Sequence, residues 1–451
     1  MLIDKNYLPI EKYLKEYSKR VEGYPNSEKV DVCLVRQDDY NYSFCLDILP
    51  CGVDDEANYV AVERLIKASL WAVGGYKLYL SSPDYVYERI KKAYSKGGER
   101  QFDSDMMARV YEREFQVIKA DKCDFPTPKS ASISVGGHLD GCRIGFDAGG
   151  SDRKVSAVVN GEVIYSEEVV WHPKTNSDPK YHYDGILTAM KTAASKMERV
   201  DAIGVSSAGI YVNNRIMVAS LFVKVSDEDF EKSVKNMYID VAKAMGNPPL
   251  EVANDGDVTA LAGALALNSG SVLGIAMGTS EAVGYINKDM GINGWLNELA
   301  FAPVDLNPSA LADEWSGDIG VGCKYFSQDA VIKLANLAGF KFEEGLTPAE
   351  KLKVIQKLAD SGDTLALAVF TDIGEYLAHT LPFYSRFYGI RHVLLLGRVL
   401  SGKGGDTIIN KAREVLKTEY PDLEVQLSVP DEKTRRVGQS IAAASLPKTR
   451  S

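Results

Sequence analysis

Two short glycine turns carry residues suited to phosphate binding. The first lies in Gly145-Phe-Asp-Ala-Gly-Gly-Ser151 and the second in Gly274-Ile-Ala-Met-Gly-Thr-Ser280. Each follows a short apolar run and precedes another, which predicts a β-hairpin closed by a glycine turn. Glycine lets backbone N–H groups approach an anion closely, and hydroxyl and ammonium groups add donors. The expected donors are those of Gly149, Gly150, Ser151, Lys154, Gly278 and Thr279.

The two turns repeat each other in sequence and in context. After each predicted hairpin come helical stretches and then a strand-like run, at 202–205 in the first half and at 392–396 in the second. Duplication of such a unit predicts two similar lobes with a cleft between them. Either turn alone fits a plain hairpin turn better, whereas the pair favours a cleft that holds a polyphosphate from both sides. Asp147 would then bind Mg²⁺, directly or through water.

A third candidate lies where an apolar run meets Asn254-Asp255, just before a helix rich in small residues. A strand end holds a carboxylate rigidly, which suits a general base. The alternative from this segment alone is an aspartate that caps the helix. Both hypotheses stay open at this point.

Bulk properties exclude several classes of protein. A chain of 451 residues, 45% hydrophobic and 25% charged, predicts two or three globular domains. The net charge of −10 argues against a nucleic-acid partner. No signal-like N-terminus is found, and no apolar run approaches the ~18 residues that span a bilayer, so we expect a cytoplasmic protein without a membrane segment. The scattered cysteines and histidines predict reduced thiols and no zinc site.

The first 140 residues predict a small α/β unit without a helix-turn-helix signature. We expect a hairpin of strands, a helix, a strand and two further helices, at 30–35, 42–49, 57–73, 76–80, 84–94 and 103–118. The predicted domains are an N-terminal α/β appendage (1–140), a first lobe (141–254), a second lobe (255–433), and a C-terminal helix (434–451) that packs back on the first lobe.

Taken in order, these segments resemble the ROK family of sugar kinases and repressors, in the actin-like ATPase superfamily. The resemblance covers about two-thirds of the chain and rests on the order and spacing of six segments: 145–154, 251–263, 274–285, 291–305, 393–402 and 437–444. It implies an α/β fold of duplicated ribonuclease H-like lobes around a central cleft, with an unusual N-terminal α/β extension.

The resemblance also implies roles for individual residues, with ATP and Mg²⁺ as cofactors. Asp255 would be the general base that takes a proton from a sugar hydroxyl. Asn254 and Glu298 would hydrogen-bond the sugar, and Ala208-Gly209 would form a turn beside it. Gly397, with Arg398 next to it, would lie against the adenosine of the nucleotide.

Four positions depart from the family pattern. Phe301 stands where the family has a sugar-contacting histidine, and Tyr325 where it has a second glutamate. Only Cys323 remains of a zinc-binding cysteine cluster, and Arg398 interrupts a glycine run. The near-Walker segment 397–404 lacks the Ser/Thr that binds Mg²⁺ and is not interpreted as a P-loop.

Two functions remain from the sequence. The first is ATP-dependent phosphorylation of a sugar or sugar derivative, in which Phe301 either stacks on a sugar face or only fills space. The alternative is a catalytically weak or inactive sugar-binding sensor that acts through a protein partner. The sequence names neither the sugar nor its phosphorylated hydroxyl, and a homodimer stays open.

Overall fold

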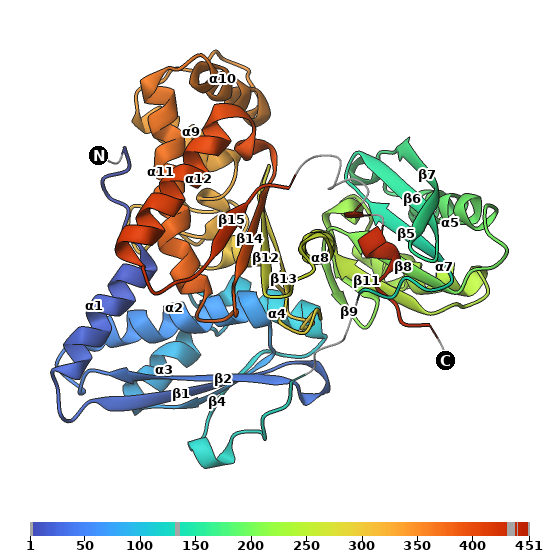
Figure 1. Cartoon of the computed structure of the whole chain (residues 1–451). Helices are drawn as coiled ribbons and strands as arrows, with labels where there is room; N and C mark the ends of the chain where they lie inside the picture. Colours follow the sequence, from blue (N-terminus) through green and yellow to red (C-terminus); the bar gives the residue numbers. More distant parts are fainter. Residues whose placement is uncertain (1–2, 131–135, 431–437, 440, 450–451) are drawn as a thin grey trace.

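The computed structural model describes residues 3–130, 136–430, 438–439 and 441–449. Figure 1 shows an N-terminal unit (blue) beneath one lobe (yellow to red) and a second body (green) beside that lobe. The green body is the first lobe in sequence order.

The N-terminal unit is a four-stranded sheet with helices. Strands β1 (Glu28–Val35) and β2 (Asn41–Ile48) form the predicted hairpin, and the strand order is β2-β1-β3-β4. The predicted strand and helices at 57–94 are confirmed as α2 (Asp55–Val73), β3 (Lys77–Ser81) and α3 (Asp84–Ala93). A further helix, α1 (Ile10–Glu22), had no prediction.

The prediction of one helix over 103–118 is wrong in its second half. Helix α4 covers Gln101–Tyr111 and ends because Glu112 adopts a left-handed conformation, with φ of 53°. The chain then forms β4 (Gln116–Lys119), which pairs in parallel with β3. Pairing with a distant strand decided this segment, which local helical periodicity cannot reveal.

The first lobe holds a five-stranded sheet ordered β11-β8-β5-β6-β7. Its elements are β5 (Cys142–Ala148), β6 (Asp152–Val159), β7 (Glu162–Val170), α5 (Pro179–Ala194), β8 (Ala202–Ser207), β9 (Ile210–Val212), β10 (Arg215–Val218), α6 (Asp227–Asp229), α7 (Met237–Ala244) and β11 (Leu250–Asn254). The first glycine turn joins β5 to β6, as predicted.

The second lobe repeats this plan with a four-stranded sheet ordered β13-β12-β14-β15. Its elements are α8 (Asp255–Leu267), β12 (Val272–Met277), β13 (Glu281–Ile286), α9 (Gln328–Leu337), α10 (Pro348–Asp360), α11 (Thr364–Tyr384), β14 (His392–Leu396), α12 (Gly402–Glu419) and β15 (Gln426–Ser428). In both lobes an antiparallel hairpin is followed by two parallel strands: β6-β5-β8-β11 matches β13-β12-β14-β15. The predicted duplication is therefore present in four strands of each lobe, and β7 of the first lobe has no counterpart among the strands of the second sheet.

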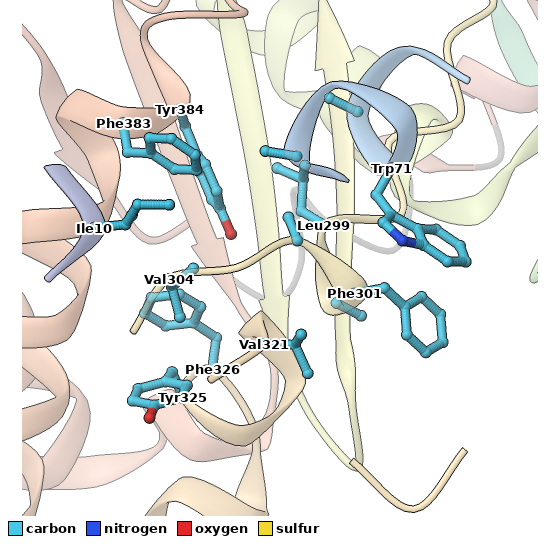
Figure 2. Packing of buried hydrophobic residues seen from close by; sticks show 14 of the residues in the cluster. Ile10, Trp71, Leu299, Phe301, Val304, Val321, Tyr325, Phe326, Phe383 and Tyr384 are labelled. Atoms are coloured by element: carbon cyan, nitrogen blue, oxygen red, sulfur yellow. The ribbon is translucent and has the colours of Figure 1, made fainter. Parts of the chain in front are cut away.

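The N-terminal unit and the second lobe share one hydrophobic core, whereas the first lobe has its own. Helix α2 is buried around almost its whole circumference because it lies between the N-terminal sheet and the second lobe. Figure 2 shows Ile10 and Trp71 of the N-terminal unit among Val304, Phe301 and Tyr384 of the second lobe.

The last described residues lie against the first lobe. Residues 441–444 are helical, and the guanidinium of Arg143 on β5 donates to the carbonyl oxygen of Pro447 at 2.7 Å. Val437 and Ser440, part of the predicted closing helix, lie outside the described residues.

A buried ionic cluster joins the N-terminal unit to the loop before α9. We call it the Asp318 cluster: Glu63, Arg64, Lys67, Arg100, Asp103 and Asp318, all at most 8% exposed. The ammonium of Lys67, fully buried, lies 2.7 Å from Asp103 Oδ1 and 3.0 Å from Asp318 Oδ2. Arg100 Nη1 lies 2.9 Å from Asp318 Oδ1. Three cations and three carboxylates balance, so no charge is buried without a partner.

Replacing Lys67 by methionine should lower the free energy of unfolding by about 3–5 kcal/mol, because it leaves two buried carboxylates short of a cation. Urea denaturation followed by circular dichroism measures the loss. Lys119→Met is the matched control, since Lys119 forms an exposed ion pair with Asp84 and its removal should change little. Equal effects of the two substitutions would contradict the structural role of the cluster.

Candidate active site

A cavity of about 360 Å³ lies where the N-terminal unit and the two lobes meet. We call it the central cavity. Six of the site residues predicted from the sequence line it: Ala208, Gly209, Asn254, Asp255, Glu298 and Phe301. Its volume is in the range of small-molecule sites. The structure therefore brings together all the residues expected to contact a sugar.

Asp255 is the first residue of α8 and follows β11 directly. The preceding residue, Asn254, is the helix cap: its side-chain oxygen accepts from the N–H of Gly256 at 2.7 Å. Asp255 Oδ1 accepts from the same N–H at 3.0 Å, so Asn254 occupies the cap position and Asp255 shares this hydrogen bond at the cavity wall. Burial, and then the nearby charge of Asp147, raises the pKa of Asp255 to about 6.

Glu298 is held in place by the N-terminal unit. Its backbone N–H donates to the carbonyl oxygen of Trp71 at 3.0 Å, and that of Asn297 donates to Ala72 at 3.0 Å. These carbonyls lie in the last turn of α2, where helical partners run out. Burial, followed by the charge of Asp255, raises the pKa of Glu298 to about 7.

An aromatic wall closes one side of the cavity. The ring centroids of Trp71 and Phe301 lie 4.4 Å apart, and those of Phe301 and Trp315 5.5 Å apart. Figure 2 shows the Trp71 and Phe301 rings side by side. The indole N–H of Trp71 donates to Asp103 at 2.5 Å, which fixes the orientation of the ring. Phe301 is therefore part of a wall built by two domains.

The Ala208-Gly209 turn approaches the backbone of the β9–β10 hairpin closely. Gly209 has a φ of 141°, and a Cβ atom there would lie 2.4 Å from the carbonyl oxygen of Val218. Only glycine fits this conformation. The Gly209 carbonyl in turn accepts from the side-chain amide of Asn254 at 2.8 Å, so the turn and the helix cap position each other.

The first glycine turn lies outside the central cavity. Asp147, at its start, accepts from the hydroxyl of Ser206 at 2.8 Å, and burial raises its pKa. Its charge still acts on Asp255. The hydroxyl of Ser151 donates to Asp152 at 2.9 Å, and the Lys154 ammonium lies 3.4 Å from the same carboxylate.

Lys174 is a candidate phosphate contact that the sequence did not indicate. A Cβ atom on Gly150 would lie 3.4 Å from its ammonium nitrogen, so this cation sits beside the turn formed by Gly149 and Gly150. It comes from the short helical turn Pro173–Thr175, which follows β7. Nothing in the local sequence marks this position, because the contact depends on how β7 returns along the hairpin.

The second turn lies against the segment expected to hold adenosine. Arg398 Nη2 donates to the hydroxyl of Thr279 at 3.1 Å. Gly397 packs onto the end of β12, since a Cβ atom there would lie 2.2 Å from the Met277 carbonyl oxygen. Gly278 and Thr279 are not among the residues that line the central cavity, but the next residue, Ser280, is.

Several cavity residues were missed from the sequence. Trp71 and Met106 belong to the N-terminal unit, and Asp313 and Trp315 lie in the loop that carries Asp318. Glu281, the first residue of β13, also lines the cavity. Tyr325, in contrast, is buried in the core and donates to the carboxylate of Asp305. It lies outside the residues that line the cavity.

A larger hollow of about 1110 Å³ lies between α12 and the edge of the second sheet, around Arg413, Tyr420 and Gln426. None of the site residues predicted from the sequence lines it. We therefore place the candidate site in the smaller central cavity, where carboxylates, an amide and aromatic rings converge.

Solved structures share this fold. A ROK family glucokinase from Streptomyces griseus, solved with glucose and AMPPNP, matches with a TM-score of 0.51 and 19% identity, over 67% of this chain and 99% of that one. A ROK hexokinase from Thermus thermophilus matches with a TM-score of 0.52 and 16% identity, over 67% and 97%. A ROK family transcriptional regulator, a homologue of the E. coli MLC protein, gives 0.52 and 17%, over 68% and 79%.

These similarities establish a mixed α/β, actin-like ATPase fold. Because the sequence identities are below 20%, they establish the fold and nothing about activity. No family model matches the sequence, and no curated protein matches it either. Within the described ranges, no helix combines the length and apolar character needed to cross a membrane.

Glu281→Gln should stabilise the protein, and more so at pH 8 than at pH 5. Burial raises the pKa of Glu281 to about 8. The unfolded chain loses this proton near pH 4–5, so the stability that the protonated group contributes is lost as pH rises toward 8. Since one pKa unit is about 1.4 kcal/mol, the gain at pH 8 should be on the order of 2–4 kcal/mol.

Denaturant titrations of both proteins at the two pH values measure this difference. The control is Glu343→Gln, because Glu343 is exposed and should show no pH-dependent gain. A gain at pH 5 that equals the gain at pH 8 would show that the Glu281 carboxyl ionises normally.

Proposed function

We propose that this protein belongs to the ROK family and transfers phosphate from ATP to a hydroxyl of a sugar or sugar derivative. The observation that carries the proposal is the convergence of Asp255, Asn254 and Glu298 with an aromatic wall in one cavity. Hydroxyl-binding polar groups beside flat rings suit a polyol with one apolar face. The fold shared with ROK kinases supports the same conclusion.

The chain offers groups that fit Mg²⁺ and the phosphates of ATP. Asp147 supplies carboxylate oxygens, the ligands that Mg²⁺ prefers. Lys154 and Lys174 supply ammonium groups beside the first turn, and Thr279 and Arg398 supply donors beside the second. When bound, ATP would supply the phosphoryl group, and Mg²⁺ would neutralise part of the negative charge on the phosphates. A protein with this chemistry would work in the ATP-containing cytoplasm.

Asp255 would accept the proton of the reacting hydroxyl. Its raised pKa of about 6 makes it a stronger base than an ordinary aspartate, while it remains ionised at neutral pH. Asn254 and Glu298 would hold neighbouring hydroxyls, and the aromatic wall would exclude water from that side. Rigid positioning of this kind accounts for a large part of phosphoryl-transfer catalysis.

Asp255→Asn should lower kcat by about 10²- to 10⁴-fold, because asparagine keeps the shape but cannot accept a proton. A coupled assay of ADP release over a panel of hexoses, amino sugars and polyols measures it. Asp289→Asn is the control, since Asp289 is exposed and outside the cavity. Absence of ADP release with every acceptor in the wild type would sink the kinase proposal.

Activity should also depend on pH through Asp255. Below about pH 6 the carboxylate becomes protonated and cannot act as a base, so kcat/KM should fall on the acid side with an apparent pKa near 6. Since Asp147 and Glu298 interact with Asp255, this apparent value belongs to the group of carboxylates. An acid limb near pH 4 would mean that Asp255 is solvated like a surface aspartate.

The second candidate function is a sugar sensor that acts through a protein partner. One contact favours it: the guanidinium of Arg398 donates to the hydroxyl of Thr279 at the second glycine turn. This hydrogen bond occupies groups that a phosphate of ATP would otherwise contact. The shared fold of a ROK transcriptional regulator is compatible with it. Calorimetry separates the two functions, because a sensor would bind a sugar and show no binding of Mg·ATP.

A further inference from the structure

The N-terminal unit is attached firmly to the second lobe and lightly to the first. It shares a hydrophobic core and the buried Asp318 cluster with the second lobe, whereas the first lobe has a core of its own. Among the described residues of the first lobe, those that reach the shared core are Ile210, Val212 and Val218 of the β9–β10 hairpin. Helix α4 lies on the side of the N-terminal unit that faces this hairpin (Figure 1). A lobe attached in this way can move as a unit unless specific contacts hold it.

One carboxylate at the end of α4 bridges this boundary. The guanidinium of Arg215, on β10, donates two hydrogen bonds to Glu112, at 2.6 and 3.0 Å. The ammonium of Lys235 lies 2.6 Å from the same carboxylate. We call these three side chains the Glu112 clasp. The hydrogen bonds from Arg215 and then from Lys235 lower the pKa of Glu112 to about 2, so the carboxylate stays charged at neutral pH.

The geometry of the clasp favours a stronger interaction than that of an ordinary surface ion pair. Isolated exposed pairs contribute little to stability, but a bidentate arginine together with a second cation forms a small network. The Lys235 side chain is only 8% exposed. Its backbone carbonyl accepts from the N–H of Ile216, the neighbour of Arg215, at 2.9 Å, so the segments that carry the two cations are joined to each other.

The backbone at Glu112 indicates independently that this side chain has a role. Its φ of 53° is left-handed, a conformation that is unfavourable for a glutamate and that glycine or asparagine usually adopts at a helix end. Glycine would end α4 without that strain. The glutamate adds the contacts to Arg215 and Lys235, which offset it.

The hairpin that the clasp holds also positions part of the wall of the central cavity. Gly209, which precedes β9, packs against the carbonyl oxygen of Val218 and accepts from the side-chain amide of Asn254. Met106, on the helix that ends at Glu112, lines the same cavity as Gly209. Separation of α4 from the hairpin would therefore widen the cavity between these two residues.

From these contacts we propose that Glu112 is a positioning residue that holds the first lobe on the N-terminal unit, so that the central cavity is assembled before a ligand binds. Holding the lobe does not rest on the proposed kinase function, whereas the effect on the acceptor does. Without the clasp, part of the population would have an open lobe. An acceptor would then have to close the lobe, which would lower its apparent affinity.

The first test compares the proteins without ligand. Glu112→Lys replaces the attraction to Arg215 and Lys235 by repulsion, so the lobe should open. Small-angle X-ray scattering should give a larger radius of gyration than for the wild type. The backbone amides of 106–111 and 210–218 should exchange hydrogen about tenfold faster or more, whereas those of β5 and β8, inside the first lobe, should not change.

Glu114→Lys is the matched control, because it makes the same change of charge two residues away. Glu114 is exposed and forms no ion pair with the part of the chain that the structure describes. Its radius of gyration and exchange rates should equal those of the wild type. Glu112→Gln, which removes the charge without reversing it, should change both quantities in the same direction as Glu112→Lys and by less. Thermal transitions followed by circular dichroism confirm folding, and Glu112→Gln decides the test if Glu112→Lys does not fold.

The second test measures the acceptor, using the compound of the hexose, amino sugar and polyol panel with the highest kcat/KM. Glu112→Lys should raise its KM by about tenfold or more and leave kcat within about twofold, because a saturating acceptor restores the closed lobe. Asp255 lies on α8 and is not held by the clasp. Saturating acceptor should also return the radius of gyration of Glu112→Lys to the wild-type value. A merely structural role would lower kcat and thermal stability without this split.

Each outcome decides one of the two proposals. An unchanged radius of gyration and unchanged exchange in Glu112→Lys would overturn the clasp, whatever the activity. Equal changes in Glu112→Lys and Glu114→Lys would overturn it as well, since they would be an effect of net charge. An open lobe with an unchanged KM, or a fall in kcat at unchanged KM, would overturn the positioning role and leave the kinase proposal intact. If the wild type turns over no acceptor of the panel, the kinase proposal fails, and scattering and exchange still decide the clasp.

Discussion

The last turn of α2 is the support on which the candidate site depends. Its carbonyl groups, left without helical partners, accept the backbone N–H groups of Asn297 and Glu298. The same turn carries Trp71, whose ring forms the aromatic wall with Phe301. One helix end therefore fixes both a polar and an apolar side of the central cavity. The N-terminal unit is a structural part of the site and more than an attachment to it.

Charged side chains near the central cavity fall into two groups, one paired and one unpaired. In the Asp318 cluster, Lys67 and two arginines neutralise the carboxylates, which anchors the loop that carries Asp313 and Trp315 to the N-terminal unit. A few residues away, the cavity acids lack such partners and their pKa values rise. The Asp318 cluster is therefore neutral, whereas the acids of the central cavity have no cationic partner. Burying acids in this way costs stability, and such a cost is typical of binding surfaces.

The sequence predicted those parts of the structure that depend on local or repeated patterns. The glycine turns, the duplicated hairpins and the strand-to-helix junction at Asp255 follow from short segments whose geometry only a few residue types permit. The prediction for 103–118 was wrong because pairing with β3 overrode helical periodicity. Glu281 and Trp71 could not be identified, since each reads locally as an ordinary strand or helix residue and gains its place from contacts between domains.

The position of Glu281 links the two roles of the second hairpin. It begins β13 immediately after the turn of Gly278 and Thr279, so a single short segment borders both the expected phosphate site and the central cavity. The Arg398 contact to Thr279 joins the adenosine segment to that turn. Burial, together with the charge of Glu298, raises the pKa of Glu281 to about 8, so the acid that begins β13 is protonated at neutral pH and places no fixed negative charge beside the turn.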